Sequence, residues 1–571
     1  MKILTIHADF IEFESKKKAL KTAEEGIKEG KHRVEECLVV FTAVEKKDEN
    51  NLKAVTEKYV QEIKNIAQQV NAKKIVLYPY AHLSSSLSNP QFAENLLKDA
   101  EKLLAEKFSV TRAPFGWYKS FTLSCKGHPL SELSREFSAE GKGKVEEKEL
   151  TEQEIKNLLN QISRSRLDTS KLKENDHRII GKNLDLWSFN EVAPGMVFWH
   201  NKGLLIKNLL IDYWREIHRR NGYQEISTPQ IMDKKLWLLS GHWVKFKENM
   251  FLTEYEKRDF SVKPMNCPGG MLVYKSSSKS YKDLPLRVGE LGIVHRQELS
   301  GVLAGLFRVI QFTQDDAHIF CTEEQVEAEV GNIIDLIKEM FAVFDLTLDH
   351  IELSTRPEKR VGSDKSWDLA ESALEKVLKH RKTAYKINKG EGAFYGPKID
   401  FHLKDSLGRT WQCSTIQLDM AMPERFDLEY ADKEGKAKRP IMLHRVIYGS
   451  IERFIGVVTE HLNGHFPLWL SPVQVKVLTV TDRNIPFAAK IMDRLKDAGI
   501  RVELDDRTET IGKKVRDAQL EKVNYMVTIG DKEVEKKNLA VRSRDGKVVF
   551  GLAVEKFVVQ LKGEIERKEL K

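Results

Sequence analysis

Three residues that favour borderline metal ions lie far apart in the sequence. Cys267 is in PMNCPGG, His318 in QDDAHIF and His444 in IMLHRVIYGS, and no local spacing rule links them. If the fold brings them together, one thiolate and two imidazoles would bind zinc and leave a fourth position open, as catalytic zinc sites do. Spacing alone favours the simpler interpretation, in which each is a buried polar side chain or a small core thiol.

Two arginines in apolar segments point to an anion. Arg296 lies in VHRQE and Arg453 in GSIERF, both beside turn residues. An unpaired guanidinium is costly in such surroundings, so each needs a fixed carboxylate, such as Glu298 or Glu452, or a phosphate. The sequence contains no G-x-x-x-x-G-K-[ST] loop and no G-x-G-x-x-G after a strand. A bound nucleotide would therefore depend on arginines to hold its phosphates.

Another pair of histidines has the spacing of metal ligands but ends a helix. His461 and His465 stand four residues apart beside Glu460, in the run EHLNGHFP. The glycine and proline of this run stop a helix, so we interpret the pair as structural or solvated rather than metal-binding.

The middle of the chain mixes helices and strands around these residues. Apolar spacing predicts helices over Gly203–Arg220, stopped by Asn221-Gly222, and over Thr322–Asp345, where Thr322 and Gln325 form a capping box. The expected strands are Leu306–Phe312, Ala393–Leu403 and Thr410–Leu418. This mixture predicts an antiparallel sheet covered by helices, an α+β domain.

The sequence predicts a smaller α/β domain at each end of the chain. Near the N-terminus, strands are expected over Met1–Ile6 and Lys74–Tyr78, and helices over Asn51–Val70 and Gln91–Phe108. A charged connector with one helix runs from about Glu140 to His177. Beyond a boundary near 467–472, strand and helix patterns alternate as in a compact α/β domain with a mixed or parallel sheet. The predicted domains span residues 1–140, 181–467 and 468–571, with a linker over 141–180.

Composition is that of a globular protein, with 41% hydrophobic and 31% charged residues among 571. The sequence has no run of 18 apolar residues and no signal-peptide pattern, so no membrane segment is expected. The five cysteines are scattered and never form C-x-x-C, which favours a reducing, cytoplasmic location over a disulfide framework. The net charge of +8 is compatible with a polyanionic partner and is weak evidence on its own.

Several longer motifs of the chain resemble those of one protein family. The run LGIVHRQELSGVLAGLFRVIQFTQDDAHIFCT, residues 291–322, closely resembles motif 2 of threonyl-tRNA synthetases and the strand that follows it. PMNCPGG, GAFYGPKIDFHL, WQCSTIQLD and HRVIYGSIERF resemble further signatures of that family. GYQEISTPQI is similar to motif 1 of class II synthetases. The resemblance runs from about residue 180 to residue 571.

The resemblance implies a class II catalytic core that joins L-threonine to tRNA(Thr) with ATP, Mg²⁺ and one zinc ion. The residues carried over are Cys267, His318 and His444 for zinc; Arg296, Glu298, Arg308 and Arg453 for ATP; Gln314, Asp316, Tyr395, Gln412 and Gln417 for threonine; His242 for the transfer step; and Pro229 for a homodimer interface.

Zinc would solve a recognition problem. Threonine and valine are nearly isosteric, and an apolar pocket separates such a pair by only about 10²-fold. A zinc ion that binds the amino and hydroxyl groups of threonine leaves valine without a partner. Serine keeps the hydroxyl and lacks one methyl, a difference worth roughly 10- to 200-fold. A second, hydrolytic site is therefore expected.

The N-terminal domain is the expected place for that hydrolytic site. YPYAHLSSSLSNP and RAPFGWYKSFTLSCKGHPLSELSR resemble the editing domain of archaeal threonyl-tRNA synthetases, which is similar in fold to D-aminoacyl-tRNA deacylases. The resemblance implies that His82, Tyr118, Lys119 and Glu132 line a site that removes serine from tRNA. Without this resemblance, the sequence predicts that Tyr118 and Lys119 belong to an exposed loop and that His82 caps a helix.

The C-terminal domain resembles the anticodon-binding domain of several class II synthetases. Arg516, Glu533 and Arg542 match positions that contact anticodon bases. Arginine can read a guanine edge and glutamate can accept from a cytosine amino group, so the residue types suit base reading. The alternative is a solvated charged face.

Few positions depart from the family pattern, and three other functions stay open. Gln297 and Leu299 replace the usual asparagine and proline of the motif 2 loop, and Gly270 replaces a histidine, which puts fine contacts to the tRNA acceptor end in doubt. The alternatives are a class II synthetase for serine, proline, glycine or histidine; an inactive RNA-binding paralogue; and an editing-only protein. The metal set with Gln314 and Asp316 argues against the first, and the two arginines argue against the others.

Overall fold

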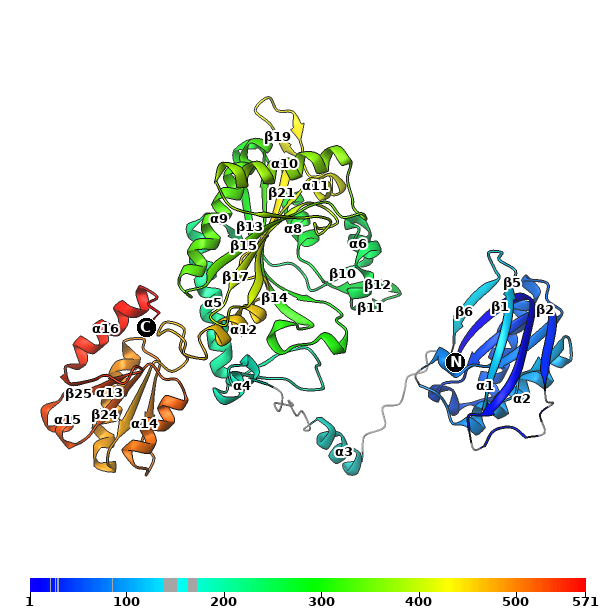
Figure 1. Cartoon of the computed structure of the whole chain (residues 1–571), viewed down its shortest axis with the longest axis horizontal. Coiled ribbons are helices and arrows are strands. Elements are labelled where there is room, and N and C mark those ends of the chain that lie inside the picture. Colours follow the sequence, from blue (N-terminus) through cyan, green and yellow to red (C-terminus); the bar gives the residue numbers. More distant parts are fainter. Residues whose placement is uncertain are drawn as a thin grey trace. The chain divides into compact units, whose positions relative to one another are not determined.

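The computed structural model describes residues 1–20, 22–25, 27, 30–84, 86–137, 151–162 and 172–570 (Figure 1). The chain divides into two compact units, Met1–Leu150 and Thr151–Lys571. Much of the expected connector lies outside the described residues, but its one helix is present as α3 (Glu152–Ile162).

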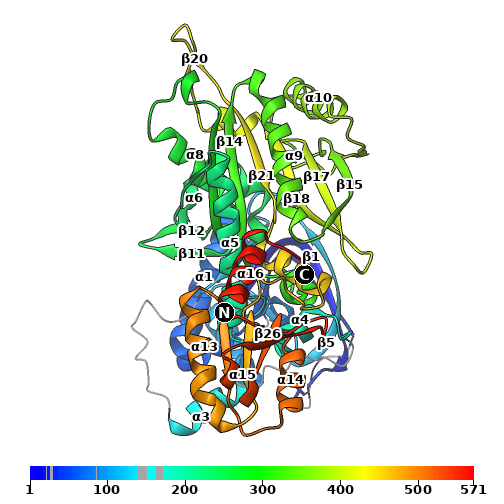
Figure 2. The same cartoon turned by 90° about the vertical axis from the view of Figure 1, so that its left-hand side faces the viewer.

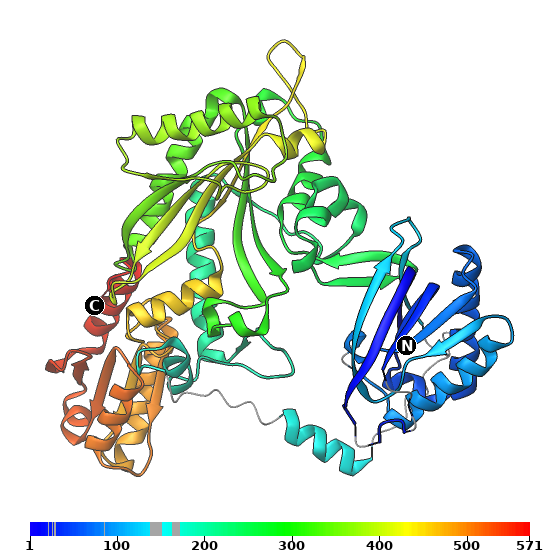
Figure 3. The ribbon, with the colours of Figure 1, turned by 45° about the vertical axis from the view of Figure 1, so that its right-hand side comes forward.

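The first unit is a six-stranded sheet with two helices on one face. Its elements are β1 (Lys2–Lys18), β2 (Lys31–Ala43), α1 (Leu52–Gln69), β3 (Lys74–Pro79), α2 (Pro90–Ala105), β4 (Ser109–Arg112), β5 (Trp117–Cys125) and β6 (Glu132–Glu136). The strand order is β4-β3-β2-β1-β5, and β6 also pairs with β1. Both predicted helices and both predicted strands are present, and the first strand is much longer than Met1–Ile6. The long blue strands are clear in Figure 3.

The alternation of β2 explains the two layers of this unit. Leu38 and Val40 pack with α1 and α2, whereas Val39 and Phe41 join a separate apolar cluster on the other face. Successive side chains of a strand point to opposite faces, so a strand that is apolar at every position must be covered on both sides.

The second unit is built on an eight-stranded sheet with the order β16-β15-β17-β18-β21-β14-β13-β9. Its strands are β9 (Gln224–Glu225), β13 (Leu286–His295), β14 (Gln311–Cys321), β15 (Thr347–Ser354), β16 (Lys386–Asn388), β17 (Lys398–Lys404), β18 (Thr410–Asp419) and β21 (Ile441–Val446). The pairs are antiparallel except for β13 with β9 and β15 with β16. The expected antiparallel sheet is confirmed.

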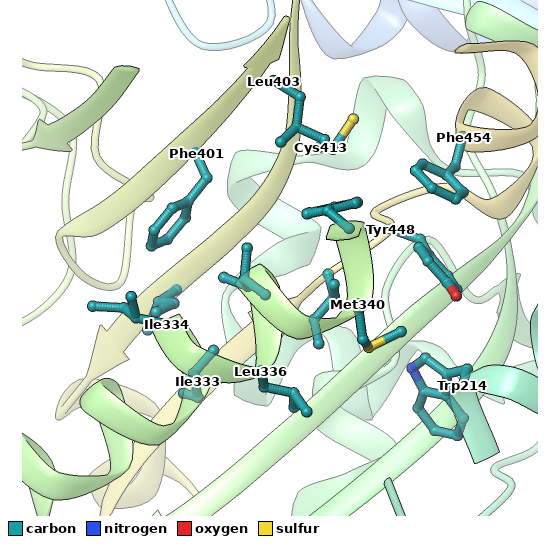
Figure 4. Packing of buried hydrophobic residues seen from close by; sticks show 14 of the residues in the cluster. Trp214, Ile333, Ile334, Leu336, Met340, Phe401, Leu403, Cys413, Tyr448 and Phe454 are labelled. Carbon is teal, nitrogen blue, oxygen red and sulfur yellow. The ribbon is translucent and has the colours of Figure 1, made fainter. Parts of the chain in front are cut away.

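Helices cover one face of this sheet. They include α5 (Asn201–Arg220), α9 (Val326–Ala342), α10 (Asp364–His380) and α12 (Ile451–His461), and α4 (His177–Asn183) packs against α12. Figure 4 shows Ile333, Ile334 and Met340 of α9 facing Phe401 of β17 and Tyr448 in the main core. The capping box of Thr322 and Gln325 is present. Among the described residues, no helix has both the length and the apolar character needed to span a bilayer.

Shorter elements flank the other side of the sheet. Apart from β7 (Trp187–Ser188) and β8 (Phe198–Trp199), which pack against the main core through Trp187 and Trp199, they are β10 (Ile231–Asp233), α6 (Lys234–Ser240), α7 (His242–Lys245), β11 (Leu252–Tyr255), β12 (Arg258–Val262), α8 (Cys267–Lys275), α11 (Ala421–Arg425), β19 (Tyr430–Ala431) and β20 (Ala437–Lys438). Of these, α8 positions the candidate thiolate at its first residue.

Two strand predictions need correction. Leu306–Phe312 is not a strand before Gln311, because Gly305–Phe307 forms a 3₁₀ turn whose Leu306 N–H donates to His177 Nε2 at 2.9 Å. The strand expected at Ala393–Leu403 begins only at Lys398. Pro397, which lacks an N–H, precedes it, and residues 393–396 form a turn.

The C-terminal region is the expected α/β domain with a mixed sheet. Its elements are β22 (Val475–Thr479), α13 (Ile485–Asp497), β23 (Val502–Asp505), α14 (Ile511–Leu520), β24 (Tyr525–Ile529), α15 (Asp531–Lys536), β25 (Leu539–Ser543), β26 (Val548–Leu552) and α16 (Val554–Glu566). The strand order is β23-β22-β24-β25-β26. α13 and α16 pack in one apolar cluster and α14 in another, and Figure 2 shows α13 and α14 on opposite sides of the strands.

Candidate functional site

The fold brings the three candidate metal ligands together. Cys267 begins α8, His318 lies on β14 and His444 on β21, and the last two face each other directly in the strand register. Their ligand atoms all lie within 4.8 Å of one another, and all three side chains are buried. Convergence of this kind cannot be read from the sequence, because it depends on a strand pairing across 126 residues.

The chemistry of this cluster fits a zinc ion. His318 Nε2 is buried without a hydrogen-bond partner in the described part of the chain. His444 Nε2 lies 2.9 Å from Asp419 Oδ2, an arrangement in which a carboxylate orients a metal-binding imidazole. Burial raises the pKa of the Cys267 thiol and lowers the pKa of His318. A buried imidazole nitrogen without a partner is costly, and a metal ion held by His318 and the neighbouring Cys267 would remove that cost.

Asp316 and Gln314 lie on the same strand as His318 and point to the same face. Asn266 Nδ2 donates to Asp316 Oδ2 at 3.2 Å, and burial raises the pKa of Asp316 to about 6. Gln314 Oε1 is buried without a partner among the described residues. Asp316 and Gln314 therefore place hydrogen-bond acceptors beside the metal cluster, where a small polar ligand can donate to them.

Gly292 makes room for Asn266. A Cβ at position 292 would lie 2.1 Å from Asn266 Oδ1, closer than any real contact. We expect Gly292→Ala to displace Asn266, release Asp316 and destabilise the chain by roughly 1–3 kcal/mol, as overpacking does. Thermal unfolding and the KM for threonine, the substrate that the sequence predicts, would both be measured. Gly301→Ala, where a Cβ meets nothing within 4 Å, is the matched control, and equal behaviour of the two variants would refute the role of Gly292.

A cavity of about 340 Å³ joins the metal cluster to the other predicted threonine residues. Tyr395 and Gln417 line it together with Cys267, Asp316 and His444. Tyr395 Oη donates to Gln417 Oε1 at 2.5 Å. Gln412 instead lines the adjoining cavity, and its Nε2 donates to Asp400 Oδ1 at 2.6 Å.

The adjoining cavity, of about 320 Å³, contains the predicted ATP residues. It is lined by Arg296, Glu298, Arg308 and Arg453, among others. Arg296 and Gln314 line both cavities, so two ligands bound in them would meet at Arg296. A nucleotide and an amino acid that react with each other need this arrangement.

The arginines do not pair with the carboxylates that the sequence offered. Glu298 pairs with Arg308 at 2.9 Å, and Glu452 pairs with Lys207 at 2.7 Å. Within the described ranges, neither Arg296 nor Arg453 forms an ion pair; their Nε atoms donate to the carbonyl oxygens of Pro264 and Phe307. Two guanidinium groups therefore face the cavity without an anion, which suits phosphate.

Other predicted residues lie outside these cavities. His242 is fully buried, with its ring nitrogens 2.8 Å from Ser240 Oγ and 3.0 Å from Met265 Sδ. Burial lowers its pKa to about 3. Pro229 is exposed, and Gly270 lies against His318, where a Cβ would be 3.3 Å from Nδ1. The structure thus leaves the roles of His242 and Pro229 as predictions.

The histidines at the end of α12 are structural, as predicted. His461 Nδ1 accepts from the Ser406 N–H at 2.9 Å, and His465 Nε2 lies 3.1 Å from Lys522 Nζ. Glu460 Oε1 lies 2.7 Å from His177 Nδ1. Each side chain has a separate partner, so these residues do not form a common site.

Sequence reasoning missed three residues that support the site. Asn266 orients Asp316, Asp419 contacts His444, and Asp400 accepts hydrogen bonds from Gln412 and from Thr415 Oγ1 at 2.8 Å. All three stand inside or beside motifs that the family resemblance quotes. A search for buried polar residues within those motifs would have found them.

In the first unit, two of the four predicted editing residues share an aromatic cluster. Lys119 Nζ lies 5.1 Å from the centre of the Tyr78 ring, and the His82 ring lies 5.3 Å from that of Tyr80, which contacts Tyr78. Tyr118 precedes Lys119 on β5, so it points to the opposite face and is 62% exposed.

Glu132 lies away from Lys119 along the same edge of β1. It pairs with Ile6 of β1, whereas Lys119 pairs with Ser15. Nine residues of strand separate these positions by about 30 Å. Cys125 Sγ, 3.5 Å away, is its neighbour instead. The described residues of one chain do not unite the four side chains, and the role of Glu132 stays a prediction.

Lys119 is held in partly apolar surroundings. Burial lowers its pKa to about 8, although Nζ donates to the carbonyl oxygens of Pro114 and Trp117 at 2.9 and 3.0 Å. Below pH 8 the side chain is charged in both folded and unfolded states, and the folded state carries the burial cost. Between pH 8 and about 10.5 only the unfolded state holds the proton, so stability rises with pH.

We therefore expect Lys119→Met to stabilise this unit below pH 8 by roughly 1–2 kcal/mol, since each pKa unit corresponds to about 1.4 kcal/mol and the side chain is partly solvated. The advantage should shrink as the pH rises to 10. Denaturant unfolding at several pH values measures it. A Lys126→Met variant serves as control, and a pH-independent difference would contradict the argument.

The predicted anticodon residues lie in three elements of the C-terminal domain. Arg516 on α14 is exposed. Glu533 Oε2 accepts from the Gly530 N–H at 3.0 Å and so caps its own helix, and Arg542 Nη1 donates to Gly546 O at 3.2 Å. Their contacts with a nucleic acid stay predictions.

Comparisons with known families cover most of the chain. Residues 1–137 match the archaea-specific editing domain of threonyl-tRNA synthetase, 247–462 the class II core domain of tRNA synthetases (G, H, P, S and T), and 474–564 an anticodon-binding domain. The expected order of a small α/β editing domain, a class II core and an α/β anticodon-binding domain is confirmed.

Individual relatives support the same family as the domain matches. A threonine–tRNA ligase of Caldanaerobacter subterraneus subsp. tengcongensis is 56% identical over 398 residues, which are 70% of this chain and 62% of that protein. The chain thus spans less than two thirds of the length of this curated relative. The RNA-binding domain of threonyl-tRNA synthetase from Cryptosporidium parvum has a TM-score of 0.66 at 39% identity, covering 69% of this chain and 99% of that one.

A second solved structure shows the same likeness. The putative threonyl-tRNA synthetase ThrRS-1 of Aeropyrum pernix has a TM-score of 0.61 at 31% identity and covers 69% of this chain and 97% of that one. With the metal cluster, the paired cavities and the three domain matches, this similarity shows that the chain belongs to the threonyl-tRNA synthetase family.

Proposed function

We propose that the chain activates L-threonine with ATP and Mg²⁺ and transfers it to the 3′ end of tRNA(Thr). The observation that carries this proposal is the pair of adjoining cavities that meet at Arg296, one beside the metal cluster and one lined by Arg296 and Arg453, which form no ion pair within the described residues. Curated relatives named threonine–tRNA ligase support the same activity.

Cys267, His318 and His444 would hold zinc, which when bound supplies an open coordination position for the amino and hydroxyl groups of threonine. Asp316 accepts a hydrogen bond from the threonine hydroxyl, and Gln417 and Tyr395 line the pocket around it. Valine offers no hydroxyl, so it would leave the open zinc position and the Asp316 oxygen that does not bind Asn266 without a ligand group, which rejects it strongly.

Activation needs positioning and charge balance rather than a covalent enzyme step. The threonine carboxylate attacks the α-phosphorus of ATP, the bond to the bridging oxygen breaks, and pyrophosphate leaves. Arg296 and Arg453 stabilise the charge that develops on the phosphates. Glu298, beside Arg308 in the same cavity, is placed to contact the base.

The proposal also covers the other domains. The first unit removes serine from mischarged tRNA(Thr) with His82, Tyr118, Lys119 and Glu132, and the C-terminal domain contacts the anticodon. A homodimer, a cytoplasmic location and the transfer role of His242 belong to the same proposal. The unpaired state of all five cysteines supports the location.

The test is ATP–pyrophosphate exchange with each standard amino acid on the zinc-loaded full chain, followed by deacylation of seryl-tRNA(Thr). Strong exchange with threonine, weaker exchange with serine and almost none with valine are expected. Folded, zinc-loaded protein that exchanges with no amino acid would refute the proposal. Exchange without seryl-tRNA hydrolysis would refute only the editing part.

A further inference from the structure

A second group of potential metal ligands lies on the outer strands of the large sheet. His350 and Glu352 are on β15, and His402 is on β17 directly opposite His350. Their ligand atoms lie within 4.8 Å of one another, and the three side chains are half-buried. Ile351 and Phe401, between them in sequence, face the main core, so the three ligands project from the opposite face.

The imidazole rings are already aligned toward one carboxylate. The two rings stack with centroids 4.2 Å apart and planes 9° from parallel. His350 Nε2 is 3.3 Å from Glu352 Oε1, and His402 Nε2 is 3.7 Å from Glu352 Oε2. Two imidazoles and a carboxylate are the donor set of many zinc sites.

Two of these groups also have a partner that fixes their orientation. Asp349 Oδ2 lies 2.6 Å from His350 Nδ1, which leaves Nε2 for a metal. Asn388 Nδ2 donates to Glu352 Oε2 at 2.8 Å. A carboxylate behind a ligating histidine and a hydrogen bond to a ligating carboxylate are the outer contacts that metal sites use.

His402 supplies the independent observation. Its Nε2 is buried and has no hydrogen-bond partner in the part of the chain that the structure describes. An ion-pair cluster alone would leave this nitrogen unsatisfied, at a cost.

We propose that His350, Glu352 and His402 form a second site for a divalent cation of the zinc class, separate from the cysteine cluster. The nitrogen-rich donor set selects Zn²⁺, Co²⁺ or Ni²⁺ over Mg²⁺ and Ca²⁺, which prefer oxygen. The ion links β15 to β17 and leaves a coordination position open to solvent. Asp400 lies opposite Glu352 in the strand register and accepts a hydrogen bond from Gln412 Nε2.

The experiment uses the full chain, stripped with a chelator and titrated with Zn²⁺ and, separately, Co²⁺. Wild type is expected to bind two equivalents. A cobalt thiolate absorption band reports the cysteine cluster and is absent from a histidine–carboxylate site. His402→Ala and His350→Ala should each bind one equivalent and keep the thiolate band. Cys267→Ser should lose that band and keep the second equivalent.

Asp349→Asn tests the outer contact and should weaken only the second equivalent, by roughly 10- to 100-fold. His380→Ala, which changes an exposed histidine paired with Glu327, is the matched control and should bind two equivalents. The proposal is overturned if wild type binds one equivalent, or if the second persists in both His350→Ala and His402→Ala. Glu352→Gln replaces either variant that does not fold.

Discussion

Arg296→Ala is expected to lower the rate of threonine-dependent ATP–pyrophosphate exchange by about 10²–10³-fold, the usual loss when one preorganised charge-stabilising group is removed. The guanidinium lines both cavities and has no carboxylate partner among the described residues. In the proposed reaction, its charge is therefore available to the phosphate that the threonine carboxylate attacks. Because this charge matters most in the transition state, we expect kcat to fall more than KM rises.

Arg215→Ala is the matched control for this experiment. Arg215 is a partly exposed arginine on α5 that pairs with Glu225 at 2.9 Å and lines neither cavity. Its loss should leave exchange within about twofold, as surface ion pairs contribute little. Thermal unfolding of both variants separates catalysis from folding. Wild-type exchange by folded Arg296→Ala protein would contradict the assignment of Arg296.

Cys267→Ser is expected to remove most of the preference for threonine over valine. A serine hydroxyl is not deprotonated near neutral pH, so the altered cluster, left with only His318 and His444 as strong ligands, should bind zinc far more weakly. Without the metal, the pocket keeps only its shape and Asp316 to distinguish a hydroxyl from a methyl, and an apolar pocket of the right shape alone gives only about 10²-fold. The kcat/KM ratio for the two amino acids, together with the Co²⁺ thiolate band, measures this.

Cys321→Ser is the matched control for the thiol. Cys321 is a buried cysteine at the end of β14, the strand that carries His318, and it packs in the apolar core. Its replacement places a hydroxyl in that core and should lower stability while leaving the ratio of threonine to valine unchanged. If Cys267→Ser kept full discrimination, metal-based recognition would be wrong.

Some helix boundaries are determined by residues close to them in the sequence. The stop at Asn221-Gly222 and the capping box of Thr322 and Gln325 both appear where the sequence predicts them. These signals act within a few residues, so nearby sequence suffices to find them. The same limit explains the error at Leu306–Phe312, where the N–H of Leu306 bonds to His177, a residue more than a hundred positions earlier.

The sequence by itself determined the residue types that the chemistry needs, the order of the three domains and several of the long helices. Tertiary structure alone decided that Cys267, His318 and His444 meet, because the register of β14 against β21 sets which side chains face each other. It also decided that Glu298 and Glu452 form ion pairs with Arg308 and Lys207, which leaves Arg296 and Arg453 for the cavity. Contacts of this kind join distant segments, and their geometry exists only once the sheet has formed.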